Sequence, residues 1–352
     1  MTEPTLPAVS IIIVNWNGRA LLEVCLRSLQ ALDYPADRLE IILVDNASSD
    51  GSVEYVRSAF PSTKILCLDA NYGFCRPNNE GAKAASGEYL VLLNNDTEVT
   101  PRWLRELVEP ALQDRDIVIC ASKMLYYDRR HTINTAGGKL TIIGGGFYRG
   151  YGDRDGPKYD APGPTGFACA AGLLVRKDFF LGSGGFDEDY FAACEEHDLS
   201  WRAWLYGYRV AYAPRAVMYH RESGTFASRS NADPQKVYLN TRNRLFNLIK
   251  NLDWWNITRG KLISACFNFY RWCSYLMTGN ARAAGAVCRA YFDFALSSGR
   301  LLRKRKSVQV GRKRSDAELY RLGVIAGFWE SLSEERRLSS STEKFYSAGK
   351  RL

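Results

Sequence analysis

The chain has 352 residues, of which 46% are hydrophobic and 24% charged, close to the usage of an average globular protein. That composition excludes an intrinsically disordered chain, a collagen and a coiled coil, and the length allows one large domain or two modest ones. The net charge of +9 is unevenly divided, because residues 1–240 sum to −5 and residues 241–352 to +14. No recognised nucleic-acid-binding module accompanies the basic part, so nucleic acid is not an expected partner.

Strands and helices are predicted to alternate along the first 112 residues. A β-branched run at 9–14 is typical of a buried parallel strand, and apolar residues follow at helical spacing over 21–29. The alternation continues as strand 39–44, helix 53–60, strand 64–68, helix 76–85, strand 89–93 and helix 101–112. This pattern predicts an α/β fold with a mainly parallel sheet flanked by helices. Polar clusters follow three of the strands, at the sheet edge where such folds bind ligands; they lie at 15–18, 45–52 and 94–98.

The next segment has a different character. Residues 126–166 are rich in Gly, Tyr, Asp and Arg and show little periodicity, so we expect loops or short strands that cover the ligand edge. Beyond it we expect a strand at 166–175, a helix at 195–206 and two short strands at 210–212 and 217–219.

Residues 241–352 are predicted to form a basic, amphipathic helical extension. In 261–278 the polar residues recur at steps of three or four, as one narrow stripe on an otherwise apolar helix: Lys261, Ser264, Asn268, Arg271, Ser274 and Thr278. The pattern is compatible with a helix packed on the preceding domain and with a helix in a membrane interface. The run 301–314 has seven basic residues and no acidic one, which suits a solvated face or attraction to anionic lipid or lipid-linked phosphate.

Cysteine usage and the N-terminus bear on the compartment. The nine cysteines form no C-x-x-C pair, so we expect reduced thiols in a cytosolic protein, and the three histidines offer no zinc-site spacing. The start MTEPTLPAVS lacks a basic segment followed by an apolar one, so no signal peptide is expected. No stretch of 18 apolar residues indicates a membrane-spanning helix.

Three groups of polar residues could carry chemistry. Asp96 ends a polar triplet after strand 89–93, where a carboxylate suits Mg²⁺ or Mn²⁺ bound to a diphosphate, or caps a helix. The acidic residues between 187 and 198 suit a general base, or the favourable start of a helix. His220 follows a short strand, where histidine serves as a metal ligand, a phosphate donor or a structural residue.

Six motifs in one order resemble a known family. They are VSIIIVNWNG, ILVDNASSDGS, NYGFCRPNNEG, YLVLLNNDTEV, GGFDEDYF with EEHDLSWR, and His220. Together they resemble the family 2 inverting glycosyltransferases of GT-A fold, and among these the bacterial rhamnosyltransferase-like enzymes of cell-surface polysaccharide synthesis. The resemblance covers roughly residues 8–250. It implies a GT-A domain over 1–240, with a nucleotide-sugar half at about 8–125 and an acceptor half at about 126–240, before the helical extension at 241–352.

The resemblance also implies site residues. Asn15 and Trp16 would contact the nucleotide base, and Asp45 would accept a hydrogen bond from a uracil or thymine imide. The loop that lines the nucleotide sugar would contain Asn71, Gly73 and Asn78, with Asn95 near the ribose or the metal and Arg76 either reaching the diphosphate or covering the pocket. Asn94-Asn95-Asp96 matches the DXD motif, with Asp96 and His220 as ligands of Mg²⁺ or Mn²⁺. Asn94 replaces the first carboxylate of that motif, which leaves one carboxylate to hold the ion.

The same resemblance implies the reaction. Glu196 occupies the place of the usual catalytic Asp, so it is our first choice for the base, with Glu195 and Asp198 as alternatives. Gly172 resembles a small residue that leaves room for the acceptor. The implied mechanism is one displacement with inversion at the anomeric carbon, which needs no covalent intermediate and no nucleophilic Ser or Cys.

Donor and partners are implied less closely. The resemblance favours dTDP-rhamnose, while Asp45 also suits UDP- and GDP-sugars. The acceptor would be a glycan or a polyprenyl-diphosphate-linked glycan, with peripheral contact through 261–314 at the cytoplasmic face of the inner membrane; a homodimer stays open. One alternative is a nucleotidyltransferase, which NWNGRALL matches poorly because it has one Gly and one Arg. Another is a binding protein on a catalytically degenerate GT-A fold, suggested by the altered NND and EEHDL motifs.

Overall fold

The computed structural model describes residues 6–221, 232–331 and 333. Its first half contains four parallel strands: β1 (Val9–Asn15), β2 (Leu39–Asp45), β3 (Lys64–Cys67) and β4 (Tyr89–Asn94). β1 lies between β2 and β4, and the register places Asn15 opposite Asp45 and Val14 opposite Asn94. The polar residues that end these strands therefore meet at one edge of the sheet, as the sequence pattern predicts.

Helices cover both faces of these strands. They are α1 (Arg19–Gln30), α2 (Ser52–Ala59), α3 (Cys75–Ala84) and α4 (Trp103–Gln113). Ile11 and Ile13 of β1 pack into the core cluster that α1, α2 and α4 complete, whereas Ile12 packs on the opposite side, with α3. A strand buried on both faces must be apolar throughout, which explains the uncharged run at 9–14.

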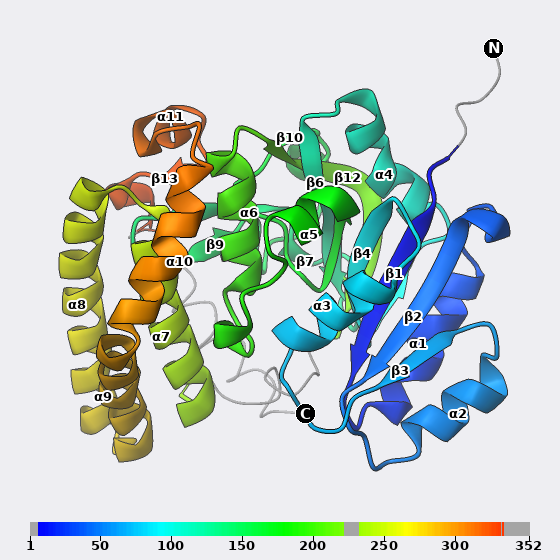
Figure 1. Ribbon diagram of the computed structural model, residues 1–352, viewed down its shortest axis with the longest axis horizontal. Coiled ribbons are helices and arrows are strands. Elements are labelled where there is room, and N and C mark those ends of the chain that lie inside the picture. The colour runs from blue at the N-terminus through cyan, green and yellow to red at the C-terminus, as the bar shows by residue number, and fades with distance from the viewer. Residues whose placement is uncertain (1–5, 222–231, 332, 334–352) are drawn as a thin grey trace.

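The second half of the sheet is mixed. It contains β5 (Thr97–Val99), β6 (Ile117–Tyr126), β7 (Ile133–Thr135), β10 (Gly163–Pro164), β11 (Gly172–Arg176) and β12 (Arg209–His220). β11 runs antiparallel between β4 and β6, while β12 runs parallel to β6 and ends against β5. The strand order is β10-β12-β6-β11-β4-β1-β2-β3, with helices on both faces (Figure 1). The predicted α/β fold with a mainly parallel sheet is confirmed.

Two strand predictions in this half are wrong in extent. The strand expected at 166–175 begins only at Gly172, because the segment before it turns away, with Phe167 bridged to Gly138 outside the main sheet. The two strands expected at 210–212 and 217–219 are a single strand, β12, with an irregularity between Ala213 and Val217. Pro214 lies in that irregularity, where its missing N–H interrupts no regular pairing.

Short elements fill the segment between the strands. β8 (Gly138–Thr141) and β9 (Gly146–Tyr148) pair antiparallel, and β13 (Ile325–Ala326), from far along the chain, pairs with β8 in a separate three-stranded sheet. Helices α5 (Lys177–Gly182) and α6 (Glu195–Leu205) complete this part, and a short 3-10 helix, η3, spans Glu188–Tyr190. The expectation of loops and short strands over 126–166 is confirmed.

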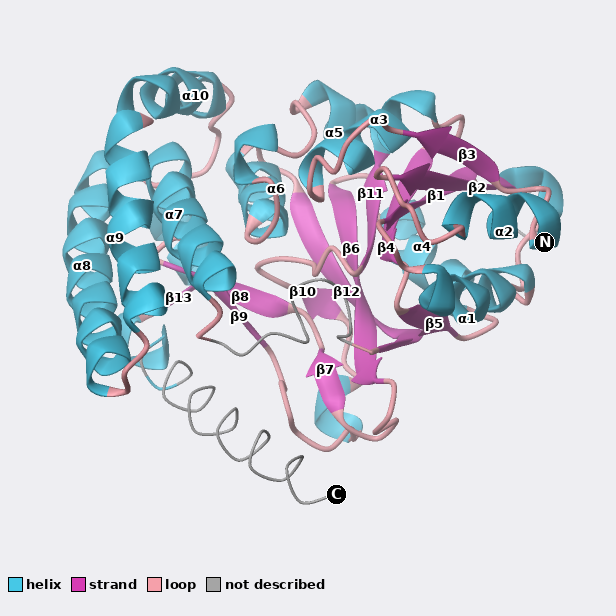
Figure 2. Cartoon of the chain, turned by 90° about the horizontal axis from the view of Figure 1, so that it is seen from below, coloured by secondary structure: helices cyan, strands magenta, loops and turns pink. Residues whose placement is uncertain are grey.

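Five helices form the C-terminal part. They are α7 (Pro234–Asn251), α8 (Trp254–Met277), α9 (Ala281–Leu296), α10 (Ser298–Val310) and α11 (Asp316–Arg321). Helices α7 to α10 stack together at the end of the molecule opposite β3 (Figure 2). The expected boundary at residue 240 falls inside α7, so the continuous helical part begins at Pro234. Among the described helices, α8 included, none combines the length and hydrophobicity needed to span a bilayer.

Most basic residues of the run 301–314 form ion pairs or hydrogen bonds within the protein. Lys304 forms ion pairs with Asp187 and Asp189, and Arg312 with Asp316. Arg305 donates to the backbone carbonyls of Ile249 and Leu252, and Arg314 donates to the backbone carbonyl of Tyr208. These four side chains neutralise or solvate groups of the fold, so the run at 301–314 is largely structural rather than a free cationic surface.

Candidate active site

The carboxyl ends of β1 and β2 form a buried polar cluster. The side-chain amide of Asn15 donates to Asp45 Oδ1 at 3.2 Å and to Ser48 Oγ at 3.1 Å. Asp45 Oδ2 accepts the backbone N–H of Ser48 at 2.9 Å, and Asn95 donates to Asn15 Oδ1 at 2.8 Å. Each oxygen of Asp45 keeps a second lone pair, so the carboxylate can still accept from a ligand. The structure thus brings together three residues that the resemblance assigns to the nucleotide.

The loop after β3 is held to this cluster by a residue that the sequence analysis missed. The amide of Asn46 donates to Asn71 Oδ1 at 2.9 Å and to the Gly73 carbonyl at 2.8 Å, while its oxygen accepts from Tyr72 N–H at 2.9 Å. Gly73 has φ near +80°, and a Cβ there would lie 2.4 Å from the Phe191 carbonyl. Glycine is therefore required both by the backbone and by the close approach of the loop around Phe191. The sequence held one indication of this role, since Asn46 directly follows Asp45 at the end of a strand.

The other predicted nucleotide-sugar residues lie around this loop. The guanidinium of Arg76 stacks over the Tyr72 ring, 3.7 Å from its centroid. Asn78 is buried in α3 and its amide donates to the Phe74 carbonyl at 2.8 Å, so that amide nitrogen is used within the helix. Trp16 follows β1 directly and its side chain is exposed, free to stack on a planar group. Arg76 therefore lies over the loop rather than over an ion-pair partner.

The two predicted metal ligands meet. Asp96 lies just after β4 and His220 ends β12, which pairs with β5 so that His220 lies opposite Thr97. This pairing places Asp96 Oδ1 3.2 Å from His220 Nε2, with Asp96 buried and Asn94 Nδ2 3.5 Å from the same nitrogen. Residues more than a hundred positions apart are thus joined by strand pairing, which the sequence could not show.

The donor set of this pair suits a divalent cation. Two neighbouring ligands of an octahedral ion, each about 2.1 Å from it, lie about 3.0 Å apart, close to the observed Oδ1–Nε2 separation. Within the described part of the chain no group of three or more His, Cys, Asp or Glu side chains is placed to hold a metal. Asp96 and His220 would therefore hold Mg²⁺ or Mn²⁺ only together with other oxygens, such as those of a diphosphate.

The predicted acidic cluster starts α6, and its members differ in their contacts. Asp198 is buried, and its oxygens accept from Arg202 Nε at 3.0 Å and from Asn251 Nδ2 at 3.0 Å, with Lys250 Nζ at 2.9 Å. Burial alone would raise the pKa of Asp198, but Lys250 and Arg202 outweigh it and the pKa is lowered. Asp198 is therefore fully engaged in a buried ion-pair network, which makes it the least suitable of the three candidate bases.

Glu195 and Glu196 are both buried, and their environments separate their roles. Burial, then the neighbouring charge of Glu196, raises the pKa of Glu195 well above its usual range. Glu195 Oε2 has no hydrogen-bond partner within the described residues. Glu196 Oε1 accepts from the Tyr148 hydroxyl at 3.3 Å. Burial and the neighbouring carboxyl group thus favour the protonated form of Glu195. Tyr148, in β9, was not singled out in the sequence.

The loop that leads to these glutamates is held by α7. Asn243 donates from its amide to the carbonyls of Tyr190, Ala192 and Ala193 at 2.7–3.1 Å. Asn247 donates to the Cys194 carbonyl at 3.2 Å and accepts from the Tyr190 hydroxyl at 2.6 Å. In this loop three non-glycine residues have positive φ: Phe191, Ala193 and Cys194. A sequence signal existed, since asparagines recur at 240, 243, 247 and 251, on one face of a helix.

Gly172, which is predicted to leave room for the acceptor, starts β11 beside buried methionine side chains. A Cβ at Gly172 would lie 2.2 Å from Met218 Sδ and 2.8 Å from its Cε, with Met124 nearby. Glycine therefore allows β11 to pack closely on these methionines. A role of Gly172 toward the acceptor stays a prediction.

Comparison with known proteins agrees with this geometry. A family model described as Glycosyl transferase family 2 matches residues 10–180, which run from β1 into α5. The O-antigen biosynthesis protein RfbC of Myxococcus xanthus is 31% identical over 245 residues, 66% of this chain and 18% of that protein. The undecaprenyl-phosphate 4-deoxy-4-formamido-L-arabinose transferase of Aeromonas hydrophila is 32% identical over 123 residues, 34% of this chain and 38% of that protein. The chain thus spans less than two fifths of either relative.

Solved structures share the fold at low sequence identity. The crystal structure of S. aureus TarS 1-349 in complex with UDP-GlcNAc has a TM-score of 0.57 and 17% identity, covering 90% of this chain and 92% of that one. The crystal structure of GalNAc-T7 with UDP, GalNAc and Mn²⁺ has a TM-score of 0.57 and 18% identity, covering 72% of this chain and 49% of that one. Because the family model covers the parallel half of the sheet and these structures share its fold, residues 10–180 form a glycosyl transferase family 2 domain and the chain adopts the GT-A fold.

Proposed function

We propose that the protein is an inverting glycosyltransferase of cell-surface polysaccharide synthesis. It transfers a sugar from a nucleoside-diphosphate sugar to a hydroxyl of a glycan or lipid-linked glycan. The observation that carries this proposal is the meeting of Asp96 with His220, with Oδ1 and Nε2 3.2 Å apart, at the sheet edge where Asn15 and Asp45 also end. RfbC, to which the chain is similar, is named for O-antigen biosynthesis, which supports the polysaccharide setting.

The donor is proposed to lie along the carboxyl edge of β1, β2 and β4. Asp45 accepts from the base, Trp16 stacks on it, and Asn15 fixes the Asp45 carboxylate through the hydrogen bond between them. The residues proposed to line the sugar, ribose and diphosphate are Asn71, Gly73, Arg76, Asn78 and Asn95. The resemblance favours dTDP-rhamnose as the donor, with UDP- and GDP-sugars as alternatives that the same Asp45 accommodates.

Asp96 and His220 are the residues proposed to hold the divalent ion. When bound, Mg²⁺ or Mn²⁺ supplies positive charge that neutralises the leaving diphosphate. The crystal structure of GalNAc-T7, which shares the fold, contains Mn²⁺ and UDP, which supports the use of a divalent metal. Asn94 cannot act as a charged ligand, and its amide nitrogen lies 3.5 Å from His220 Nε2.

The proposed reaction is one displacement. The Glu196 carboxylate takes the proton of an acceptor hydroxyl, and that oxygen forms a bond to the anomeric carbon while the bond from this carbon to the diphosphate oxygen breaks. Tyr148 orients Glu196 by donating to Oε1. Attack from the side opposite the leaving group inverts the anomeric configuration, and no covalent sugar–enzyme bond forms.

The acceptor is proposed to be a glycan, free or linked to polyprenyl diphosphate, at the cytoplasmic face of the inner membrane. The relative from Aeromonas hydrophila is named for transfer to undecaprenyl phosphate, which supports a lipid-linked acceptor. Peripheral membrane contact through the helical part, including 261–314, belongs to the same proposal.

Calorimetric titration tests the donor site directly. UDP, dTDP and GDP are titrated into the full chain with Mg²⁺, with Mn²⁺ and without metal. We expect one nucleotide to bind in a metal-dependent manner, and Asp96→Ala to abolish the metal dependence because one of only two protein ligands is lost. Asp37→Ala, which removes an exposed carboxylate at the other end of β2, is the matched control and is expected to bind as wild type.

The titration can also contradict the proposal. If none of the three diphosphates binds, or if binding is metal-independent and insensitive to Asp96→Ala, the donor site is not where we place it. If nucleotides bind but no sugar is transferred or hydrolysed, the alternative of a degenerate GT-A-fold binding protein gains support.

A further inference from the structure

Helix α8 is amphipathic, but the usual orientation is reversed, because polar residues face the protein and large apolar residues are exposed. Its buried side carries small and polar residues, among them Gly260, Ser264 and Asn268. Asn268 donates to Ser264 Oγ at 3.2 Å and to the Tyr291 hydroxyl of α9 at 3.2 Å. Part of the polar stripe that the sequence shows therefore forms hydrogen bonds within α8 and between α8 and α9. Many large apolar and aromatic residues of α8 are consequently exposed, although Ile257 is buried and Trp272 packs against the cluster that α7 and α9 form.

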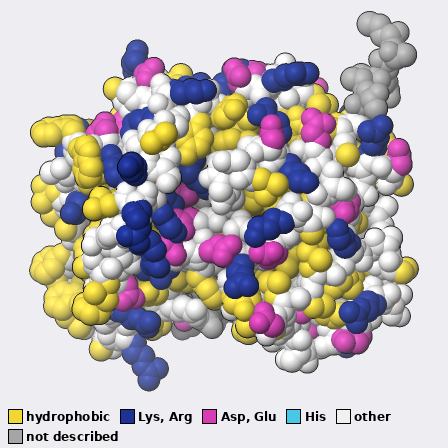
Figure 3. All heavy atoms as spheres, viewed as in Figure 1, with side chains coloured by type: hydrophobic (Ala, Val, Ile, Leu, Met, Phe, Trp, Pro, Cys, Tyr) yellow, Lys and Arg dark blue, Asp and Glu magenta, His cyan; other side chains and the backbone are white. Residues whose placement is uncertain are grey.

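Helix α9 continues this exposed apolar surface. It buries alanines and Val287 toward α7 and α8 and leaves large apolar residues outside. We define the α8–α9 face by six side chains, each 64–79% exposed: Trp255, Leu262, Phe269, Met277, Phe292 and Leu296. Figure 3 shows hydrophobic side chains gathered along the edge of the molecule where α8 and α9 lie. Contiguous exposed apolar surface of this kind marks a binding surface rather than ordinary solvent contact.

The charge around this face has one sign. Between residues 254 and 296 there are five basic residues and one acidic residue. The acidic one, Asp293, accepts from the Tyr238 hydroxyl at 2.5 Å and lies 3.7 Å from Arg289, so it is already neutralised. Lys261 and Arg282 are exposed beside the apolar side chains. Aromatic and aliphatic residues flanked by Lys and Arg are the composition of surfaces that enter an anionic lipid interface.

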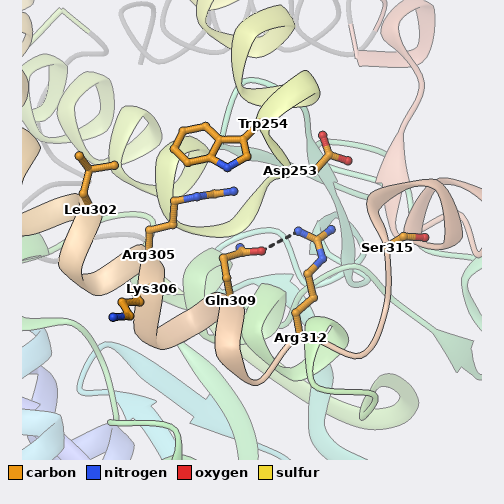
Figure 4. A pocket seen from close by; sticks show the side chains of 8 residues that line it. All are labelled: Asp253, Trp254, Leu302, Arg305, Lys306, Gln309, Arg312 and Ser315. Carbon is orange, nitrogen blue, oxygen red and sulfur yellow. Dashed lines mark hydrogen bonds between the residues drawn. The ribbon is translucent and has the colours of Figure 1, made fainter.

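A cavity of about 460 Å³ opens between the first turn of α8 and α10. Trp254 and Leu302 provide apolar walls, and the Trp254 indole lies over the Arg305 guanidinium, 4.3 Å from ring centroid to Cζ (Figure 4). The Arg305 guanidinium donates to backbone carbonyls, whereas Lys306, which also lines the cavity, is exposed. The cavity therefore adds an apolar wall and an exposed ammonium group close to the start of α8.

We propose that the α8–α9 face docks on the anionic surface of a lipid bilayer, with its six apolar side chains in the interface and Lys261, Arg282 and Lys306 at the level of the phosphates. This inference rests on the proposed function for its setting, since it names the surface that would bring the enzyme to a lipid-linked acceptor. Charge selects the bilayer over a second copy of the chain, because two such faces would bring like charges together without acidic partners.

Vesicle co-sedimentation of the full chain tests the proposal. Vesicles of pure phosphatidylcholine are compared with vesicles that also contain phosphatidylglycerol. We expect binding to the mixed vesicles, and Leu262→Gln with Phe292→Gln to lower the partition coefficient about tenfold or more, because two large apolar groups no longer leave water. Leu112→Gln with Leu181→Gln, which removes exposed leucines from α4 and α5, is the matched control and is expected to bind as wild type.

A variant that lacks two basic side chains separates the electrostatic contribution to vesicle binding from the apolar one. Lys261→Gln with Arg282→Gln is expected to weaken binding to the mixed vesicles by roughly fivefold for each charge, with no change on pure phosphatidylcholine. Salt should weaken wild-type binding to the mixed vesicles more strongly than that of this variant, which keeps only Lys306 of the three proposed phosphate contacts.

Two outcomes would overturn the inference. Absence of vesicle binding by wild type, or equal loss in the Leu112/Leu181 control, removes the α8–α9 face as a docking surface. Concentration-dependent dimerisation without lipid, seen by analytical ultracentrifugation and abolished by the Leu262/Phe292 variant, assigns the face to a second copy instead. Donor binding measured in solution is independent of both, and Asp96→Ala should still bind vesicles, so failure of this inference and failure of the proposed function are distinguishable.

Discussion

Buried carboxyl groups close together on α6 differ because their partners differ. Asp198 has Arg202, Lys250 and Asn251 around it and serves the fold. Glu195 lacks such partners, and burial raises its pKa. Glu196 receives one hydrogen bond, from Tyr148. Burial without compensation suppresses ionisation, whereas Lys250 and Arg202 favour the charged form of Asp198, so the pKa values of these carboxyl groups shift in opposite directions.

We expect Glu196→Gln to lower kcat by roughly 10²- to 10⁴-fold, because the amide cannot accept a proton from the acceptor hydroxyl. Nucleoside-diphosphate binding should be unchanged, since the residues proposed to bind the donor lie at the ends of β1, β2 and β4 and in the loop and helix that follow β3. Steady-state transfer assays and calorimetry on the same preparation separate the two effects.

Glu195→Gln is the matched control, because it makes the same change one position earlier. A smaller loss of kcat is expected, because burial raises the pKa of Glu195 and glutamine resembles its protonated form. The opposite ranking, with Glu195→Gln inactive and Glu196→Gln active, would assign the base to Glu195.

At the scale of elements, α7 holds the loop that precedes the proposed base. The amides of Asn243 and Asn247 donate to four backbone carbonyls of the 190–194 loop: those of Tyr190, Ala192, Ala193 and Cys194. Phe191, Ala193 and Cys194 adopt positive φ, which costs about 1 kcal/mol or more each for residues other than glycine. Such a conformation persists only when surrounding contacts enforce it, and these amides are the contacts.

Asn243→Ala removes three of those hydrogen bonds at once. We expect kcat to fall roughly tenfold to a hundredfold because Glu196 is displaced, while donor affinity is retained. The free energy of unfolding should fall by about 2 kcal/mol, since buried carbonyls lose their donor. Urea unfolding and transfer kinetics measure the two quantities.

Gln235→Ala, on the exposed first turn of the same helix, controls for a change in α7 itself. It should leave both quantities unchanged. If Asn243→Ala lowers stability but leaves kcat intact, α7 supports the fold without positioning the base.

At the scale of the whole molecule, charges from distant segments neutralise each other. Asp187 and Asp189 come from the acidic part of the chain, and Lys304 of α10 forms ion pairs with both. Lys250 of α7 pairs with Asp187 at 2.7 Å. Burial would raise the pKa of Asp187, but Lys250 and Lys304 lower it well below its usual range. These ion pairs therefore hold α7 and α10 to the loop that leads to α6.

Lys304→Met should lower the free energy of unfolding at neutral pH by about 2 kcal/mol, because Asp187 and Asp189 lose a charged hydrogen-bond donor. An Asp whose folded pKa is lowered contributes stability above its unfolded pKa of about 3.9 and loses it as pH falls toward the lowered value. The difference between wild type and variant should therefore be full near pH 7 and shrink below about pH 4.

Lys306→Met changes a neighbouring exposed lysine of α10 and is the matched control. It should unfold like wild type across the same pH range in urea titrations. A deficit of Lys304→Met that is independent of pH would show that packing of the methylene chain, and not the ion pairs, explains the effect.

Much of the site was predictable because strand ends share an edge. Asn15, Asp45 and Asp96 follow apolar runs, and a parallel sheet brings such positions together wherever the chain continues. Asn46, Tyr148 and Asn243 were not predicted, because their roles consist of hydrogen bonds to groups of distant segments. The packing of Met218 against Gly172 was likewise not visible in the sequence.

The sequence by itself determined the alternation of strands and helices, the polar ends of the strands and the helical character of the C-terminal part, because hydrophobic period and turn residues act locally. Tertiary structure decided which way each helix faces, which charges are paired and which carboxyl group keeps its proton. Those properties depend on burial and on partners far along the chain, such as Lys304 for Asp187 and α9 for the polar side of α8, and local pattern carries no information on either.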